Sequence, residues 1–318
     1  MAVRELGPAS LRVVRAVRAQ LDSTEVALVA CSGGPDSLAL AAALAHVAGG
    51  TSVLIAGACV DHGLQPGSAA QATTTVAQLV ALGFPVAETL RADVDRTNPA
   101  GPEAAARHAR YAALDAAADR LGATTILLGH TRDDQAETVL LGLARGSGTR
   151  SLAGMASRNG RYGRPLLELP RRDTVTACAE WGLTPWADPH NGDPRYARVR
   201  VRARVLPVLE AELGPGIDIA LARTAELARA DADLLDALAA DADPGTAELA
   251  VELLVDLPAA LRSRVLRRWL LRIGSAEVGL DHVRAVAALV TDWHGQRGVD
   301  LPGLRIVRRS GNLSGRHR

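Results

Sequence analysis

The chain has 318 residues, of which 48% are hydrophobic, and a formal net charge of +1. All 36 of its Lys-or-Arg residues are arginine, which excludes a Schiff-base lysine, a pyridoxal phosphate lysine and a Walker-type phosphate loop. Its three cysteines, Cys31, Cys59 and Cys178, form no CxxC pair, which argues against a cysteine-ligated zinc or iron–sulfur site.

Short apolar runs alternate with helical patterns over the first half of the chain. We predict strands at Glu25–Ala30, Ser52–Val60, Pro85–Leu90 and Thr124–Gly129. We predict helices between and after them, at Asp36–Val47, Ala69–Leu82, Pro102–Leu121 and Asp133–Ala144. This alternation is typical of an α/β fold with a parallel, doubly wound sheet that is covered by helices on both faces. Ligands of such sheets bind beyond the carboxyl ends of the strands.

The second half is expected to be mainly helical. Loops are predicted at Gly146–Gly163 and Trp186–Tyr196, with helices at Thr174–Trp181 and Arg198–Leu213. The turn at 214–216 (Gly-Pro-Gly) is the best domain boundary. We therefore expect a catalytic domain over residues 1–213 and a smaller, mainly helical domain over residues 214–318. Its predicted elements are helices at Ile219–Ala242, Pro258–Ile273 and Asp281–Trp293 and a hairpin within Val299–Ser314.

Charge is spread unevenly along the chain. Residues 145–204 and 257–318 carry net charges of +7 and +8, whereas residues 1–144 and 205–256 carry −4 and −10. Two basic blocks separated by an acidic one indicate a polyanionic partner that is bound at two places, the alternative being solvated surface arginine. No apolar run approaches the ~18 residues of a membrane span, and the N-terminus lacks a signal-peptide pattern. We expect a cytoplasmic protein without a membrane partner.

The strongest motif is the segment Ser32–Ser37 (SGGPDS), between a predicted strand and a predicted helix. Gly33 and Gly34 allow a tight turn with inward-pointing amides, and the helix that follows adds positive partial charge at its N-terminus. Asp36 would repel bare phosphate, so its presence indicates a bridging Mg²⁺. The alternative is a glycine-rich turn with Ser and Asp as helix caps.

A second polar group follows the strand Thr124–Gly129. On a helix, His130, Asp133, Asp134 and Glu137 have the spacing i, i+3, i+4, i+7 and share one face. That face would lie at the carboxyl end of a strand, where a site is expected. The alternative is a capped helix with a solvated acidic face.

Two further motifs carry charged or polar groups. Arg107 and Arg110 lie on one face of the predicted helix Pro102–Leu121 and could neutralise charge at an α-phosphate, or could be surface arginines. Asp61 and His62 end the second predicted strand and could contact a nucleoside, or form an Asx-type turn.

The SGGPDS segment resembles the SGGxDS signature of the PP-loop ATP pyrophosphatases, which cleave ATP between the α and β phosphates and adenylylate a substrate. Over roughly residues 24–212 the motifs are similar, in this order, to those of the tRNA(Ile)-lysidine synthases within that family. The similarity continues through Arg164–Leu167, Trp186–Asp188, Tyr196 and the arginines that follow. Val199 replaces the family's usual Asn, which puts one side-chain contact in doubt. The chain resembles the family's short form.

The resemblance implies an adenine nucleotide α-hydrolase-like fold and a defined reaction. ATP, as co-substrate, would adenylylate the oxygen on carbon 2 of the wobble cytidine in the CAU anticodon of an isoleucine tRNA. Free L-lysine would then attack that carbon, and AMP would leave. The implied catalytic residues are Asp36, Asp134, Arg107, His130 and Glu137. The implied nucleotide-binding residues are Ser32, Gly33, Gly34, Pro35, Asp36, Ser37, Asp61, His62 and Arg110.

The same resemblance suggests where Mg²⁺ and the other substrates bind. Asp36 and Asp134 are the expected ligands of Mg²⁺. The expected substrate-binding residues are Asp133, Arg145, Arg198, Arg200 and Arg202. Which of His130, Asp133 and Glu137 accepts the proton of the lysine amine stays open.

Two rival functions are weighed. A PP-loop tRNA thiolase would usually need paired cysteines, which the chain lacks. A non-catalytic nucleotide- or tRNA-binding module is disfavoured because every acidic and Ser position of the phosphate loop is present. The oligomeric state stays open, with a homodimer as one arrangement that the sequence allows.

Overall fold

The computed structural model describes residues 6–22, 26–63, 67–95, 101–146, 148–275 and 278–317. The chain divides into two compact units. Unit 1 comprises Met1–Arg145 and Gly154–Ala225, and unit 2 comprises Gly146–Ala153 and Glu226–Arg318. The turn at 214–216 lies between two helices, whereas the compact units divide inside the second of them. The extent of the functional domains therefore stays a prediction.

Unit 1 contains a six-stranded sheet in the order β3-β2-β1-β4-β6-β5. The strands are β1 (Val26–Ala30), β2 (Leu54–Asp61), β3 (Val86–Arg91), β4 (Thr125–Leu128), β5 (Arg158–Asn159) and β6 (Tyr162–Gly163). All neighbours are parallel except the β5–β6 pair. The predicted parallel α/β sheet is thus confirmed, within the described residues.

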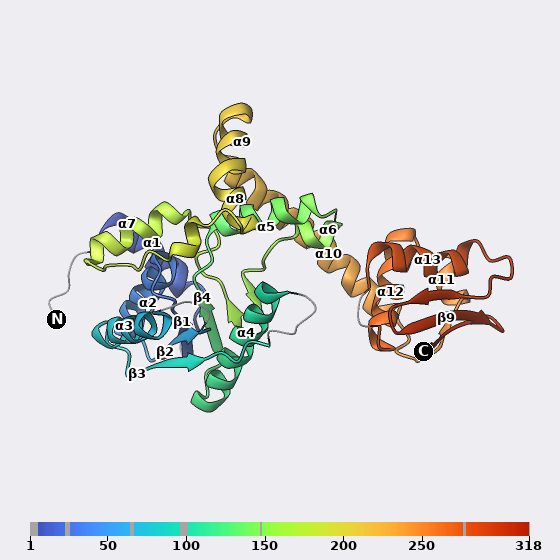
Figure 1. The fold of residues 1–318 in the computed structure, drawn as a ribbon, viewed down its shortest axis with the longest axis horizontal. Helices are drawn as coiled ribbons and strands as arrows, with labels where there is room; N and C mark the ends of the chain where they lie inside the picture. Colours follow the sequence, from blue (N-terminus) through green and yellow to red (C-terminus); the bar gives the residue numbers. More distant parts are fainter. Residues whose placement is uncertain are drawn as a thin grey trace. The chain divides into compact units, whose positions relative to one another are not determined.

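Helices cover both faces of this sheet (Figure 1). They are α1 (Pro8–Arg18), α2 (Pro35–Ala48), α3 (Ser68–Ala81), α4 (Pro102–Leu121) and α7 (Arg171–Trp181). A further helix, α5 (Arg132–Ala144), follows β4. Ala27 and Val29 of β1 join the core beneath α1, α2 and α7, whereas Leu28 joins the core beneath α4. Because successive side chains of a strand point to opposite faces, β1 is buried on both sides.

The strand order reverses between β1 and β4. The chain steps from β1 outward to β2 and β3, and then returns to the other side of β1 to form β4. Ala30 pairs in register with Leu128, the last residue of β4. The segments that follow β1 and β4 therefore emerge side by side, at the topological switch point where doubly wound sheets bind their ligands.

Residues 186–225 complete unit 1. A 3₁₀ turn η1 (Pro189–Gly192) leads to α8 (Ala197–Arg200), the π-helical turn η2 (Val201–Val205) and α9 (Leu206–Leu213). The π turn lies directly before Pro207, whose missing N–H cannot continue an α-helical ladder. After the turn at 214–216, α10 (Ile217–Asp241) begins in unit 1 and ends in unit 2.

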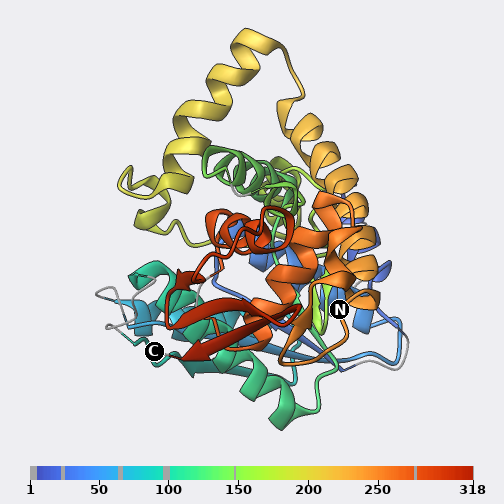
Figure 2. The same cartoon turned by 90° about the vertical axis from the view of Figure 1, so that its right-hand side faces the viewer.

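Unit 2 has its own core of helices and an antiparallel sheet. Its elements besides α10 are α6 (Thr149–Leu152), β7 (Leu249–Ala250), α11 (Glu252–Val255), α12 (Ala259–Arg272), α13 (Leu280–Thr291), β8 (Val299–Leu301), β9 (Leu304–Arg309) and β10 (Asn312–His317). Figure 2 shows the red strands lying against orange helices, and the sheet order is β7-β10-β9-β8. The indole of the buried Trp269 donates to the carbonyl of Ala247 at 3.0 Å. The expected hairpin is thus part of a larger sheet than the sequence indicated.

Within the described residues, no helix is both long and apolar enough to cross a bilayer.

Candidate functional site

The phosphate-loop segment closes on itself between β1 and α2. Gly33 has a φ of 83°, a left-handed conformation that favours glycine. The backbone N–H of Ser32 donates to Oγ of Ser37 at 3.1 Å, and that hydroxyl donates to the carbonyl of Gly34 at 3.0 Å. The loop therefore holds a fixed shape at the N-terminus of α2, where helix-end amides attract anions.

Neighbouring segments of the chain pack tightly against this loop. A Cβ at Gly33 would lie 2.6 Å from Oγ1 of Thr75 on α3, and the N–H of Trp186 donates to the carbonyl of Gly33 at 2.8 Å. At the end of β4, a Cβ at Gly129 would lie 2.9 Å from the backbone nitrogen of Ser37. Both glycines are thus needed for close backbone approach.

A cavity of about 880 Å³ opens over the loop. The expected site residues that line it are Ser32, Gly34, Pro35, Asp36, Ser37, Asp61, His62, Arg110, His130, Asp134 and Arg202. Residues from the ends of β1, β2 and β4 and from α4 therefore meet in one place. Of the expected residues that the structure describes, Gly33, Arg107, Asp133, Glu137, Arg145, Arg198 and Arg200 are outside this lining.

Arg171, which the sequence analysis did not single out, lies at the centre of the acidic groups. Its Nε is 3.0 Å from Oδ2 of Asp36, and its Nη2 is 2.6 Å from Oδ1 of Asp134. Its Nη1 is 3.8 Å from Oε1 of Glu137. The sequence does contain a signal: Arg171 is in the first turn of α7, where a cation opposes the helix dipole and needs acidic partners.

The pKa values of Asp36 and Asp134 shift in opposite directions. Burial raises the pKa of Asp36, although Arg171 and the hydroxyl of Thr174, which donates to Oδ1, act in the opposite sense. Burial also acts to raise the pKa of Asp134, but the charge of Arg171 and the N–H of Thr131 outweigh it and lower that pKa. The Thr131 N–H and hydroxyl donate to Oδ2 of Asp134 at 2.8 and 3.0 Å, so Asp134 also caps α5.

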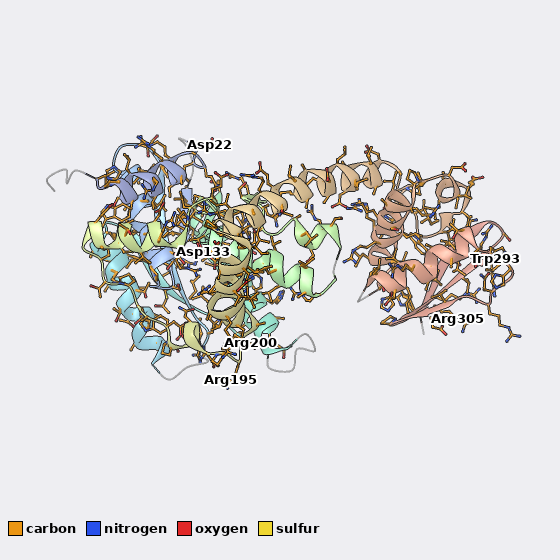
Figure 3. All side chains as sticks on the ribbon, turned by 90° about the horizontal axis from the view of Figure 1, so that it is seen from above. Asp22, Asp133, Arg195, Arg200, Trp293 and Arg305 are labelled. Atoms are coloured by element: carbon orange, nitrogen blue, oxygen red, sulfur yellow. The ribbon has the colours of Figure 1, made fainter. Side chains whose placement is uncertain are left out.

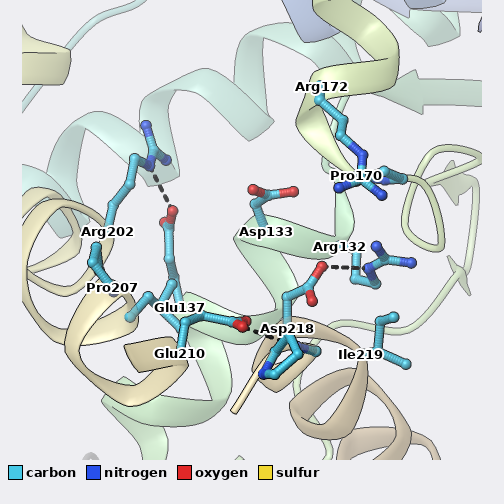
Figure 4. Close-up of a pocket in the computed structure, with 13 residues that line it drawn as sticks. Arg132, Asp133, Glu137, Pro170, Arg172, Arg202, Pro207, Glu210, Asp218 and Ile219 are labelled. Carbon is cyan, nitrogen blue, oxygen red and sulfur yellow. Dashed lines mark hydrogen bonds and ion pairs between the residues drawn. The ribbon is translucent and has the colours of Figure 1, made fainter. Parts of the chain in front are cut away.

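The acidic face of α5 divides between two cavities. His130 and Asp134, four residues apart, line the cavity over the phosphate loop. Asp133 and Glu137, also four apart, line a second cavity of about 620 Å³ (Figure 4). Successive residues of an α-helix are about 100° apart, so the side chains of Asp133 and Asp134 point in different directions from α5, and each lines a different cavity. The prediction that all four act on one face is therefore met only in pairs.

Glu137 is fully buried and surrounded by arginines. Nε of Arg202 donates to its Oε1 at 2.6 Å, and Nη1 of Arg198 is 3.7 Å from its Oε2. Among the residues that the structure describes, its Oε2 has no hydrogen-bond partner. Burial raises the pKa of Glu137, with Arg202 and Arg171 acting against it. The result is a carboxylate with one oxygen ready to accept a donor, which a general base requires.

The two site histidines are held neutral. Burial lowers the pKa of His130 to about 3, and the nearby arginines add to this effect while Asp134 opposes it. Burial and the charge of Arg110 lower the pKa of His62. Nδ1 of each ring is buried without a hydrogen-bond partner. A neutral His130 with so low a pKa is a poor proton acceptor.

The remaining expected arginines have separate surroundings. Arg107 is exposed and lies 5.0 Å from the ring centroid of Tyr111, to whose hydroxyl it donates at 3.2 Å. Arg145 is exposed at the end of α5. Figure 3 shows Arg200 beside Arg195, and Arg200 donates to the carbonyl of Arg195 at 2.7 Å. These side chains are not brought to the phosphate loop in this structure.

Asp36 and Asp134 are the expected magnesium ligands. No group of three or more His, Cys, Asp or Glu among the described residues is arranged to hold a metal ion. Asp36 and Asp134 do converge on one cation, the guanidinium of Arg171. Because Mg²⁺ in nucleotide sites takes one or two carboxylates and completes its shell with phosphates and water, this pair fits such an ion once Arg171 moves aside.

Comparison with known proteins places this geometry in a class. The family model of the PP-loop domain matches residues 10–209, and that of the TilS substrate binding domain matches residues 249–314. The first match alone spans more than half of the chain. The protein is therefore a PP-loop enzyme, a class that uses ATP.

Curated relatives define the family within that class. The chain is 55% identical to the tRNA(Ile)-lysidine synthase of Thermobifida fusca over 303 residues, covering 93% of both chains. It is 51% identical to that of Streptomyces coelicolor over 92% of this chain and 85% of the relative, and 48% identical to that of Mycobacterium bovis over 93% and 92%. The chain belongs to the tRNA(Ile)-lysidine synthase family.

A solved structure shows the same fold. The U34-tRNA thiolase NcsA of Methanococcus maripaludis, solved with its [4Fe-4S] cluster, superposes with a TM-score of 0.58 at 17% identity. The similarity covers 69% of this chain and 77% of the thiolase. At this identity the comparison concerns the fold alone.

Proposed function

We propose that the protein ligates free L-lysine to carbon 2 of the wobble cytidine in the CAU anticodon of an isoleucine tRNA. ATP first adenylylates the oxygen on that carbon, and AMP and pyrophosphate are released. One observation carries the proposal: a lysine-free SGGPDS loop and three clustered carboxylates lie at one sheet edge, in a chain 55% identical to a tRNA(Ile)-lysidine synthase.

The phosphate loop is proposed to hold the pyrophosphate part of ATP. The amides of Gly33 and Gly34, the hydroxyls of Ser32 and Ser37 and the N-terminus of α2 supply donors and positive partial charge. Mg²⁺ held by Asp36 and Asp134 together with phosphate oxygens would neutralise the negative charge of the leaving pyrophosphate. Arg171, freed from Asp36, is then in position to bind a phosphate oxygen.

The other end of the nucleotide is proposed to lie near β2 and α4. Asp61 and His62 line the cavity at the end of β2 and would contact the adenosine. Arg110 lines the same cavity and would offset charge at the α-phosphate. Arg107 would assist from its exposed position on the same helix by turning from Tyr111 toward the nucleotide.

The second cavity is proposed to receive the free lysine. Figure 4 shows four carboxylates in its wall, those of Asp133, Glu137, Glu210 and Asp218, beside the guanidinium groups of Arg132, Arg172 and Arg202. Arg132 pairs with Asp218 at 2.8 Å and Arg202 with Glu137 at 2.6 Å. The apolar side chains of Leu206 and Ile219 also line the cavity. A cationic amine on a four-carbon chain matches acidic groups beside an apolar surface. The amine must lose a proton before it attacks, and Glu137 is the proposed acceptor because its Oε2 is buried and has no hydrogen bond.

Arg202 connects the two cavities in this proposal. It lines both of them, donates to Glu137 at 2.6 Å and lies 3.5 Å from Oδ1 of Asp134. Arg198 donates to the hydroxyl of Thr138 at 3.2 Å and lies beside Glu137. We propose that these two arginines position the carboxylate between the adenylated base and the incoming amine.

The tRNA is proposed to contact both basic blocks of the chain. Arg145 and Arg200 of the first block would bind backbone phosphates near the anticodon. In unit 2, Arg305 and Arg316 stand opposite one another on β9 and β10, and Nη1 of Arg305 is 3.6 Å from Oδ1 of Asp300. These two arginines would offer positive charge to the tRNA backbone. Residues 214–318 would then act as the tRNA-binding domain of a cytoplasmic enzyme, which the match to the substrate-binding family model supports.

The thiolase alternative is not favoured by the cysteines. Cys31, Cys59 and Cys178 are all buried and without disulfides. Burial raises the pKa of the Cys59 and Cys178 thiols to about 12, and it also raises that of Cys31. Thiols that stay protonated at neutral pH are poor carriers of sulfur.

The proposed function is tested with radiolabelled lysine, ATP and two tRNA transcripts. Isoleucine tRNA with the CAU anticodon should incorporate one lysine per molecule, whereas methionine tRNA with the same anticodon letters should incorporate little. Incorporation of labelled sulfur in place of lysine would favour the thiolase. Binding of tRNA and ATP without incorporation of either label would favour the non-catalytic module.

A further inference from the structure

An aromatic pair in the wall of the phosphate-loop cavity has no part in the chemistry described above. Tyr196 and His190 both line this cavity, and their ring centroids are 5.7 Å apart with planes inclined at 44°. The Tyr196 side chain is 36% exposed. The chain has only 3% Phe, Trp and Tyr, and an exposed aromatic face in a polar wall is a surface on which a planar ligand can stack.

Backbone contacts hold Tyr196 in place. Its N–H donates to the carbonyl of Asp193 at 3.2 Å, and its own carbonyl accepts from the N–H of Arg200 at 3.2 Å. Nη1 of Arg200 donates to the carbonyls of Pro194 and Arg195 at 2.8 and 2.7 Å. The turn that presents the ring is thus fixed before any ligand arrives, which lowers the entropy lost on binding.

The arginines near the Tyr196 ring carry positive charge, which is complementary to the phosphates of a nucleic acid backbone. The Arg195 side chain is 82% exposed and bonded only locally, to Asp193 at 2.6 Å. Arg198, Arg200, Arg202 and Arg204 follow within nine residues of the ring. Aromatic faces flanked by arginine are typical of proteins that bind single-stranded RNA, in which bases stack on the rings and phosphates meet the guanidinium groups.

The elements that the Tyr196 segment joins favour an RNA base over adenine as the group that stacks on the ring. Asp61 and His62, which are proposed to contact adenosine, lie at the end of β2. The segment that carries Tyr196 runs instead from the loop contact of Trp186 to the helix whose Arg198 and Arg202 contact Glu137. It therefore ends at Glu137, the carboxylate that is proposed to accept the proton of the lysine amine beside the adenylated base.

We propose that Tyr196, supported by His190, is a stacking surface for an unpaired base of the tRNA anticodon loop, and that Arg195 binds a phosphate beside it. This inference rests on the proposed function. It adds which part of the cavity wall recognises the RNA. Tyr196 is thereby a tRNA-binding residue and takes no part in the binding of ATP.

Two substitutions at one position test the stacking surface. Tyr196→Phe keeps the ring and Tyr196→Leu keeps only apolar bulk. With isoleucine tRNA, the Phe variant should have a wild-type KM. The Leu variant should raise the KM for tRNA, and the Kd for tRNA in filter binding, by about 5- to 150-fold, the range expected when one base–aromatic stack is lost. An unchanged tRNA Kd and KM in Tyr196→Leu would overturn the proposal.

A measurement without tRNA separates an RNA base from adenine. In calorimetric titration with ATP and Mg²⁺ alone, Tyr196→Leu should bind ATP as tightly as the wild type. Weaker ATP binding with an unchanged Kd for tRNA would assign the ring to adenine and overturn the proposal. Arg195→Gln should lower the slope of log Kd for tRNA against log salt by about one phosphate contact, and an unchanged slope would remove Arg195 from it.

The same measurements separate this inference from the proposed function. Wild-type protein that incorporates lysine, with a Leu variant of unchanged tRNA affinity, would overturn the stacking surface alone. Wild-type protein that binds tRNA in a Tyr196-dependent way but transfers no lysine would overturn the proposed function and support the stacking surface.

Discussion

Nε of Arg171 lies 3.0 Å from Oδ2 of Asp36, so the first turn of α7 is bonded to the first turn of α2. The same guanidinium bonds Asp134 at the start of α5. The N-termini of α2, α5 and α7 thus meet around the guanidinium group of Arg171. Asp36 and Asp134 are also the proposed magnesium ligands, so in that proposal Arg171 occupies the metal position in the absence of nucleotide and would have to yield part of it when nucleotide binds.

Replacing Arg171 should destabilise the protein and increase its response to magnesium. In Arg171→Gln, buried carboxylates lose their shared cation, a loss that costs about 3–5 kcal/mol when a buried pair is broken. We expect a clearly lower Tm, and a larger rise in Tm on adding Mg²⁺ without ATP than the wild type shows. The exposed neighbour gives a control: Arg172→Gln should match the wild type in both measurements. Equal responses of Arg171→Gln and wild type to Mg²⁺ would contradict the shared position.

Replacing Glu137 should separate the two chemical steps. Glu137→Gln preserves the shape and the bond from Arg202 but removes the proposed proton acceptor. We expect lysine transfer to fall by about 10²–10⁴-fold, the usual contribution of a general base, while pyrophosphate release on adenylation of the tRNA continues. Glu168→Gln, on an exposed carboxylate, should leave both steps unchanged. If Glu137→Gln transferred lysine at the wild-type rate, the assignment of the base would be wrong.

Adding one methyl group to the phosphate loop should affect nucleotide binding and leave folding intact. A Cβ at Gly34 would meet only Oγ of Ser32, at an ordinary 3.6 Å. Gly34→Ala should therefore melt like the wild type, yet bind ATP about ten-fold or more weakly, because the methyl group fills space that a phosphate needs. Gly50→Ala, at a position with similar room, should change neither quantity. Normal ATP affinity in Gly34→Ala would place the phosphates elsewhere.

The buried His130 should make stability depend on pH. Its folded pKa of about 3 lies below the value of about 6.5 for an unfolded histidine. Its contribution is therefore fully present above pH 6.5 and is lost as pH falls from 6.5 toward 3, because only the unfolded chain takes up the proton. Between pH 7.5 and 5.0, wild type should lose about 1–2 kcal/mol more unfolding free energy than His130→Asn.

Urea unfolding of both proteins at several pH values measures this difference. Asp36 and Glu137 are present in both chains, so their titrations largely cancel in the comparison. His130 lowers the pKa of Asp134, so the measured difference includes that interaction. Parallel stability curves would show that His130 is protonated in the folded protein near pH 5.

The sequence predicts the sheet well because its strands are buried on both faces and read as apolar runs. The strands expected at Ser52–Val60 and Thr124–Gly129 match β2 and β4 within two residues at each end. The two-residue strands β5 and β6 were assigned to a loop, since so short a segment has no periodicity. They extend the sheet beside β4 only through tertiary pairing.

The candidate site was predictable where local chemistry defines it. The Ser32–Ser37 loop needs only its own residues and the helix that follows. Arg171 was missed because it is 135 positions from Asp36, and arginine is too frequent in this chain to attract attention. The division of Asp133 from Asp134 depends on which cavities the folded chain encloses. Leu143 is 61% exposed, since α5 buries only part of its apolar side.

The central claim is that a loop of backbone amides, without any lysine side chain, holds the diphosphate that leaves while AMP is transferred to the base. The direct measurement uses ATP labelled at the α and γ phosphates, isoleucine tRNA with the CAU anticodon and lysine, with separation of the products. The account predicts AMP and pyrophosphate, formed in equal amounts with one lysine incorporated per AMP. ADP and orthophosphate as products would contradict it.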